Sequence, residues 1–155
     1  MQIPIKKLTN GFEIPSYGMG LSRMGGSDEA DYSQDEEWVQ AIKGAINSGI
    51  THFDTAEVYG AGHNEELLGQ AIKGADRSKL FIASKVWASH QTYDGIMKAC
   101  EDSLKRLGTD YLDLYTMHSF PEPDKPIAKA MRALTELVDQ GVIKNIGASN
   151  FTINR

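Results

Sequence analysis

Two alternating hydrophobic patterns run along the chain. Short apolar runs, typical of buried strands, lie about thirty residues apart, and between them apolar residues recur every three to four positions, as in amphipathic helices. This alternation predicts repeated β-α-β units and therefore a parallel sheet. The expected strands lie near residue 17 and at residues 50–54, 80–85, 111–117 and 142–148.

Each interval between these strands carries the start and stop signals of one helix. In the first interval, Ser33 and Glu36 have the spacing of a capping box, and an apolar stripe that includes Trp38 follows them. A glycine after each stripe predicts the end of the helix. The residues expected at the helix starts are Ser33, Asn64, Thr92 and Pro126, and the closing glycines are Gly49, Gly74, Gly108 and Gly141.

A hairpin is predicted ahead of these units. The segments Ile3–Leu8 and Phe12–Ile14 flank Asn10 and Gly11. An Asn-Gly pair is preferred where a two-residue turn needs positive φ at both positions. We therefore expect an N-terminal β-hairpin before the parallel strands.

Two architectures share the β-α rhythm, an open doubly wound sheet and a (β/α)8 barrel. The glycines after the first expected strand do not form GxGxxG, whereas polar residues follow several strands at their carboxyl ends, as in barrel enzymes. A barrel needs roughly 250 residues, and this chain has 155. We therefore expect an α/β fold of the (β/α)8 TIM-barrel type, truncated to about five strands and four helices, with residues 1–155 as a single domain, the N-terminal half of a barrel. Five strands cannot close, so the open barrel edges favour self-association.

Composition and charge exclude several classes of function. The 16 Lys and Arg residues are scattered, and with 21 Asp and Glu residues they give a net charge of −5, which argues against binding to nucleic acid or to an anionic membrane. The sequence shows neither a transmembrane-length apolar run nor the apolar core of a signal peptide. The single cysteine, Cys100, falls in an apolar helical register and fits a reducing compartment. We expect a cytoplasmic protein whose partner is a small molecule or another protein.

Four ionisable side chains lie at or just beyond the ends of the expected strands: Asp54, Tyr59, Lys85 and His118. Alone, each of the tyrosine, the histidine and the aspartate has an ordinary structural explanation. An inward-facing Lys85 is different, because a buried ammonium needs an anionic partner and Asp54 on the adjacent strand supplies one. A phenol beside an ammonium suits protonation of a carbonyl oxygen, because the positive charge stabilises the phenolate that forms. No side chain donates hydride, so reduction would require a nicotinamide or a flavin.

These residues also resemble those of the aldo-keto reductases. The resemblance covers essentially all 155 residues, including the N-terminal hairpin. The stretches that carry it, in chain order, are Asp54-Thr55-Ala56, Tyr59-Gly60, Asn64-Glu65, Ser84-Lys85, Asp113–His118 and Gly147–Phe151.

The resemblance implies a (β/α)8 barrel in which hydride passes from NADPH to a small aldehyde or ketone substrate. Tyr59 would be the general acid, Lys85 would promote its proton transfer, and Asp54 would hold Lys85. His118 would orient the substrate carbonyl, and Trp87 matches a position that often lines the substrate pocket. The positions that match cofactor-binding residues are Gly20, Leu21, Asp54, Ser149 and Asn150.

The sequence also departs from the family pattern. The later strands and loops that hold most of the cofactor in the family have no counterpart in these 155 residues, so we expect weak NADPH binding and weak or no activity from this chain. After Gly20 the sequence reads Leu21-Ser22-Arg23, where many members have Thr followed by Trp. The pocket near this loop is therefore expected to have a different shape.

Two other functions fit parts of the pattern. A non-catalytic homologue could use the open half-barrel as a docking surface, although a binding module has no need of the four site residues. A metal-dependent hydrolase could use His52, Asp54 and His118, but Lys85 would repel a cation and no HxH or HExxH spacing occurs, so no metal is expected. The remaining histidines, His63 and His90, are expected at the solvated surface.

Overall fold

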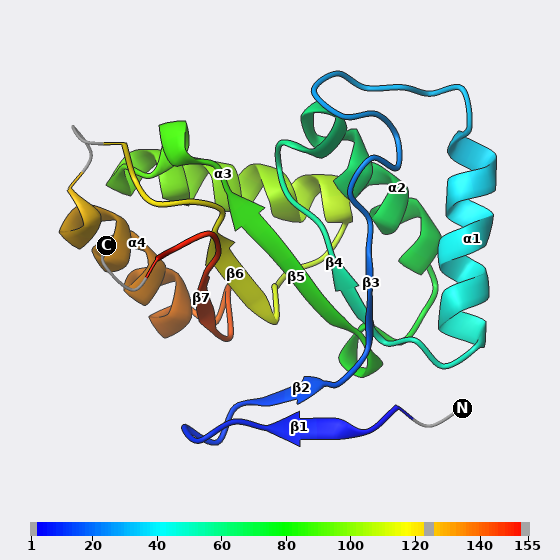
Figure 1. Cartoon of the computed structure of the whole chain (residues 1–155), viewed down its shortest axis with the longest axis horizontal. Coiled ribbons are helices and arrows are strands. Elements are labelled where there is room, and N and C mark those ends of the chain that lie inside the picture. Colours follow the sequence, from blue (N-terminus) through cyan, green and yellow to red (C-terminus); the bar gives the residue numbers. More distant parts are fainter. Residues whose placement is uncertain (1–2, 123–125, 153–155) are drawn as a thin grey trace.

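The computed structural model describes residues 3–122 and 126–152, which contain a five-stranded parallel sheet (Figure 1). Each strand of this sheet pairs with the next one in the sequence. A doubly wound sheet reverses its order at a switch point, whereas a barrel adds its strands in sequence, so the order confirms the barrel-type prediction. The strands are β3 (Gly18–Gly20), β4 (His52–Asp54), β5 (Phe81–Val86), β6 (Leu114–Met117) and β7 (Ile146–Ala148).

One α-helix lies between each pair of consecutive strands, as predicted (Figure 1). The helices are α1 (Asp35–Asn47), α2 (His63–Ile72), α3 (Tyr93–Leu107) and α4 (Ile127–Asp139). Short 3-10 turns are η1 (Tyr59–Gly62), η2 (Arg77–Lys79) and η3 (Ala88–His90). Within residues 3–122 and 126–152, none of the helices has both the length and the apolar character needed to cross a membrane.

The predicted N-terminal hairpin is present, and it lies across the end of the sheet at which the strands begin (Figure 1). Its strands are β1 (Ile5–Lys7) and β2 (Glu13–Pro15), and the ring of Phe12 contacts that of Phe81 with their centroids 5.8 Å apart. The turn differs from the prediction, because the Leu8 amide bonds the Phe12 oxygen at 2.8 Å around a three-residue loop. In this loop Gly11 has a positive φ but Asn10 does not; the Asn10 side chain instead accepts a hydrogen bond from the Phe12 amide.

The helix starts agree only in part with the sequence signals. Thr92 caps α3 as predicted, accepting a hydrogen bond from the Gly95 amide at 3.1 Å. Ser33 does not cap α1, which begins two residues later without a side-chain cap. The Ser33 amide instead donates to the Asp31 carboxylate at 3.0 Å, so a local turn takes the place of the capping box. Pro126 precedes α4 by one residue rather than opening it.

The two faces of the sheet differ in chemistry. Residues paired in a parallel register share a face, and neighbours along a strand alternate between faces. The face beneath the helices is buried and mostly apolar, and it includes Phe53, Ile82, Val86, Tyr115 and Met117. On the opposite face Asp54 pairs with Gly20 and Ala83, and Lys85 pairs with Thr116. The apolar face therefore anchors the sheet, and the opposite face presents the polar residues.

Candidate active site

Lys85 and Asp54 form an ion pair on the open face of the sheet. Lys85 Nζ donates to Asp54 Oδ1 at 2.5 Å and to the backbone oxygen of Thr55 at 2.9 Å. Lys85 is 8% exposed, whereas the side chain of Asp54 is 42% exposed. A nearly buried ammonium requires such acceptors. The structure thus brings the two residues together as the sequence predicted.

Tyr59 reaches the same ion pair from the loop after β4. Its hydroxyl oxygen lies 3.4 Å from Lys85 Nζ. The next two residues have left-handed backbone conformations, with φ of 55° at Gly60 and 52° at Ala61. At Gly60 a Cβ would lie 2.3 Å from the Gly25 oxygen, so only glycine fits. Left-handed φ is uncommon for a residue such as Ala61, and strained backbone of this kind concentrates at functional sites.

Asn64 fixes this loop from inside α2. Its fully buried side chain accepts a hydrogen bond from Thr55 Oγ1 at 2.5 Å and donates to the oxygens of Leu21 and Met24 at 2.5 and 2.7 Å. The prediction that Asn64 caps α2 is therefore wrong, and Gly62 occupies that position. The side-chain amide of Asn64 instead holds the loop after β3 against the loop after β4.

His118 completes the group at the end of β6. Its ring lies edge to face with those of Tyr59 and Trp87, with centroids 5.6 and 5.1 Å apart. Burial, followed by the positive charge of Lys85, lowers the pKa of His118 below 6.5, and the Asp54 charge opposes this only in part. The ring is therefore neutral at pH 7. Among the described residues, its buried Nδ1 has no hydrogen-bond partner. The residue also lines the cavity described below.

Glu57, which the sequence did not single out, holds Trp87 in place. Its side chain is 7% exposed and accepts a hydrogen bond from the Trp87 amide at 2.5 Å. Both carboxylate oxygens also lie 3.1 Å from His90 Nδ1. The sequence offered no local signal for this contact, because Glu57 and His90 are 33 residues apart in the chain. Trp87 itself is 40% exposed and lines the cavity described next.

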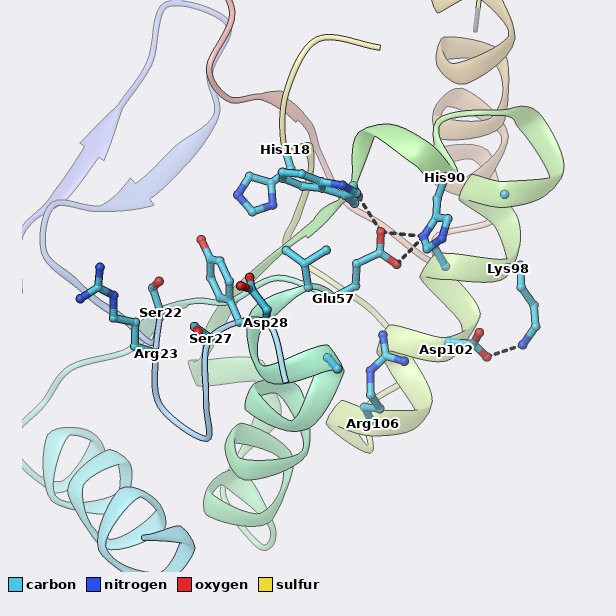
Figure 2. A pocket seen from close by; sticks show the side chains of 16 residues that line it. Ser22, Arg23, Ser27, Asp28, Glu57, His90, Lys98, Asp102, Arg106 and His118 are labelled. Atoms are coloured by element: carbon cyan, nitrogen blue, oxygen red, sulfur yellow. Dashed lines mark hydrogen bonds and ion pairs between the residues drawn. The ribbon is translucent and has the colours of Figure 1, made fainter. Parts of the chain in front are cut away.

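A cavity of about 840 Å³ opens beside these residues. Tyr59, Trp87 and His118 are among the residues that line it. Figure 2 shows that its lining runs from His118 past Glu57 and His90 to Lys98, Asp102 and Arg106 of α3. Its volume is in the range that accommodates small organic ligands. No group of three or more possible metal-ligating side chains occurs in the part of the chain that the structure describes.

The residues expected to bind cofactor surround the same end of the sheet. A Cβ on Gly20 would meet no atom within 4 Å, so there is open space beside Asp54, its partner in the register. The Leu21 amide and oxygen are already bonded, to the Asp54 oxygen and to Asn64. Beyond β7, Asn150 has a positive φ and donates to the His118 oxygen at 2.7 Å and to Ser149 Oγ at 3.1 Å.

A buried polar chain supports β5 from the other face. Glu65 is fully buried and accepts hydrogen bonds from Ser84 Oγ at 2.5 Å and Arg106 Nε at 2.7 Å. Ser84 precedes Lys85, so alternation along the strand points these two side chains in opposite directions. The strand that carries the ammonium is therefore fastened to both α2 and α3.

His63 is buried, not solvated as the sequence analysis predicted. Its ring is 4% exposed, its two nitrogens lie 2.8 Å from the Asp35 carboxylate and 2.9 Å from that of Glu66, and the Tyr32 ring packs on it. Burial alone lowers the pKa of His63, but its hydrogen bonds to the Glu66 and Asp35 carboxylates outweigh this effect and hold the pKa above 6.5. His63 thereby joins the start of α1 to the start of α2.

The comparison with protein families matches residues 17–155 to the aldo/keto reductase family. An aldo-keto reductase of Mycobacterium sp. (strain JLS) is 39% identical over 154 residues, which cover 97% of this chain and 51% of that protein. A glyoxal reductase of Bacillus subtilis (strain 168) is 41% identical over 150 residues, which cover 96% of this chain and 50% of that protein. The chain spans about half the length of the curated relatives it matches.

Solved structures give the same picture. A thermostable aldo-keto reductase in complex with the inhibitor epalrestat is 48% identical, with a TM-score of 0.93 over 98% of this chain and 56% of that one. An aldo-keto reductase from Klebsiella pneumoniae in complex with NADPH is 35% identical, with a TM-score of 0.85 over 99% of this chain and 52% of that one. The likeness extends over nearly the whole of this chain and about half of each neighbour.

Proposed function

This chain belongs to the aldo/keto reductase family, and on that premise we propose that it supplies the proton-donating half of an NADPH-dependent oxidoreductase that reduces an aldehyde or ketone to an alcohol. The observation that carries the proposal is the nearly buried Lys85 ammonium, which joins the Asp54 carboxylate to the Tyr59 hydroxyl on the open face of the sheet. A binding module has no use for this costly arrangement.

In the proposed reaction, Tyr59 donates its hydroxyl proton to the carbonyl oxygen of the substrate. Lys85 stabilises the phenolate that remains, and Asp54 keeps the ammonium in place, since it lies 2.5 Å from Nζ. His118, neutral at pH 7, orients the carbonyl by donating a ring N–H to its oxygen. Trp87 forms a wall of the substrate cavity.

The residues present fit the nicotinamide end of a dinucleotide. There is open space at Gly20 beside Asp54. After β7, the Asn150 side chain bonds the backbone oxygen of His118 and Ser149 Oγ, so polar groups lie beside the end of β6. Gly20, Leu21, Asp54, Ser149 and Asn150 would hold this end of NADPH, Leu21 through close packing because its backbone groups are already bonded. The bound cofactor would supply the hydride that the carbonyl carbon receives.

We treat residues 1–155 as one domain that provides the N-terminal half of the barrel, because the chain covers 51% of the mycobacterial relative. On this view the chain by itself is weakly active or inactive, and the cofactor and proton-donor sites come together in a complete barrel. Self-association through the open sheet edges stays a prediction.

Replacing Tyr59 with Phe tests the proposal. In a protein that carries this sequence within a complete barrel, Tyr59→Phe should lower kcat for NADPH-dependent reduction of 4-nitrobenzaldehyde by about 10²-fold or more, since the proton donor is lost. The measurement is the decrease of NADPH absorbance. Tyr17→Phe is the matched control, because Tyr17 is 68% exposed and does not line the cavity. Reduction that survives Tyr59→Phe unchanged would contradict the proposal and favour a non-catalytic homologue.

A further inference from the structure

The turn between β5 and α3, residues 87–91, carries Trp87 and is held from several sides. Glu57 bonds the Trp87 amide from the loop after β4. At the other end of the turn, Thr92 caps α3, and a Cβ on Gly95 would lie 2.4 Å from the His90 oxygen. Figure 2 shows the side chains of Glu57 and His90 in direct contact beside the cavity. The turn is therefore packed closely between the Tyr59 loop and the first turn of α3.

Gln91 ends this turn, and its side chain is fully buried. Its Nε2 donates to the Val86 oxygen at 3.3 Å and to the Ser119 oxygen at 3.1 Å. Because both neighbours are carbonyl oxygens, only the NH2 end of the amide can face them. Val86 directly precedes Trp87, and Ser119 directly follows His118. The Gln91 side chain thus bonds the backbone next to Trp87 and the backbone next to His118, and both of these residues line the cavity.

The same carbonyl also ties the two strand ends to each other. The Val86 oxygen accepts the backbone N–H of His118 at 2.9 Å as well as the Gln91 amide. The last paired residues of β5 and β6 are Val86 and Met117, so this bond is at the end of the ladder. The Gln91 contact with Ser119 therefore extends the connection between the two chains past the last ladder pair, where Trp87 and His118 lie edge to face.

Gln91 is a poor choice for stability alone. Among the described residues, its Oε1 is a buried oxygen without a hydrogen-bond partner. A buried acceptor left without a partner destabilises the folded state, and an apolar side chain of similar shape would avoid that cost. The role that accounts for a glutamine here is the one its two donated hydrogen bonds perform.

From these contacts we infer that Gln91 is a positioning residue. It holds the ends of β5 and β6 so that Trp87 and His118 keep their edge-to-face arrangement beside the reacting carbonyl. This inference rests on the proposed function. Gln91 touches neither substrate nor cofactor in this role. It acts through the backbone oxygens of Val86 and Ser119.

The test is the titration of the His118 ring by NMR in wild type and Gln91→Met, in the chain as it stands. Methionine keeps the shape of glutamine and removes both donors. We expect the His118 resonances to shift and the midpoint to rise toward 6.5, because a displaced ring regains solvent. His52 and His63 give internal references in the same spectra, since general loosening of the fold would move them too.

Gln70→Met is the matched control, because Gln70 is exposed on α2. A Gln91→Met variant that folds with an unchanged His118 resonance and midpoint overturns the inference, and so does one that moves all histidines equally. If Gln91→Met does not fold, hydrogen exchange of side-chain amides in the wild type decides. Slow exchange at Gln91 relative to Gln70 supports the two hydrogen bonds, and equal rates overturn them.

These measurements do not depend on turnover. A displaced His118 in Gln91→Met, combined with reduction that is indifferent to Tyr59→Phe, would refute the proposed function and leave the Gln91 contact standing. An unchanged His118 in Gln91→Met, combined with reduction that is lost in Tyr59→Phe, would refute only the role of Gln91. In a complete barrel, the positioning role further predicts a lower kcat for 4-nitrobenzaldehyde in Gln91→Met with unchanged NADPH binding, a split that Gln70→Met should not show.

Discussion

Cys100 lies in α3 within the hydrophobic core, and its side chain is fully buried. Burial, with a smaller contribution from the nearby Glu65 charge, raises the pKa of its thiol to about 12. The reactive form of a cysteine is the thiolate, so this thiol is inert in the folded state for two reasons, its ionisation and its access. The burial agrees with the apolar helical register in which the sequence places this residue.

We expect Cys100 to resist modification in the native protein. Incubation with 5,5′-dithiobis(2-nitrobenzoic acid) at pH 8 should release almost no thionitrobenzoate, because the thiol is protonated and covered. Addition of guanidinium chloride should release one equivalent, which matches the single cysteine. Rapid stoichiometric release without denaturant would show that α3 opens locally.

At the level of single residues, the sequence predicted the contacts that follow from regular alternation. The pairing of Lys85 with Asp54 was predictable from the sequence, because both residues lie near the ends of adjacent parallel strands. Glu57 and Gln91 could not, because their partners are in turns whose course no periodicity describes. His63 was misplaced because its partner Asp35, at the start of α1, is 28 residues away in the chain and no local pattern links the two.

Helices α2 and α3 approach each other through Gly69. A Cβ at this position would lie 2.6 Å from the Arg106 oxygen and 2.9 Å from the Leu107 oxygen, which are backbone atoms. The same helix contributes Glu65, which binds Arg106, and Asn64, which holds two loops of the site. The distance between these two helices therefore sets where both residues lie.

A pair of glycine substitutions separates this packing effect from helix propensity. Gly69→Ala should destabilise the fold by about 1–3 kcal/mol, because the added methyl group meets backbone that cannot move aside cheaply. Gly44→Ala, in α1, should stabilise it by about 0.5–1 kcal/mol, because a Cβ there meets nothing within 4 Å. Urea unfolding followed by circular dichroism measures both. Two changes of the same sign would mean that the helices can separate without strain.

His63 makes the contact between α1 and α2 depend on pH. Its raised pKa means that the imidazolium contributes fully below 6.5 and that the contribution is lost as the pH rises through the pKa in the folded state. His63→Gln should therefore cost about 1–3 kcal/mol at pH 6 and clearly less at pH 9. Urea unfolding at the two pH values checks this. An equal loss at both values would show that the charge of His63 is unimportant.

Element order was read from the sequence more securely than element boundaries. The thirty-residue rhythm predicted a parallel sheet with one helix per interval, and the strand order confirms it. Thr92 was recognised because its cap is local, bonding an amide three residues away. Ser33 was misread because its capping signal competed with a turn at Asp31 and with the attachment of Asp35 to His63.

Over the whole molecule, the residues proposed for proton donation lie near the middle of the sheet, whereas those expected to bind cofactor lie toward its outer strands. Asp54 and Lys85 belong to β4 and β5, while Gly20 ends β3 and Ser149 follows β7. The contacts proposed for proton donation are therefore complete within the described residues. Those proposed for the cofactor would involve its nicotinamide end only.

We accordingly expect the 155-residue chain alone to bind NADPH weakly. Titration of NADPH fluorescence should show no saturation at low-micromolar cofactor, whereas a protein that carries the sequence within a complete barrel should saturate. The reason is that a dinucleotide bound at the nicotinamide end alone gains too few contacts to offset the loss of its translational and rotational freedom. Tight binding by the short chain would mean that residues 1–155 hold far more of the cofactor than we propose.

Strand β5 places an ammonium on one face and its anchor to the helices on the other, in consecutive residues. Deleting or inserting one residue between Phe81 and Lys85 would exchange the faces, sending the charge of Lys85 beneath the helices and Ser84 into the open. The length of this strand therefore matters to the site as much as its chemistry does. A one-residue insertion or deletion should be tolerated instead in the exposed turn around Gly74, where the backbone carries no part of the site.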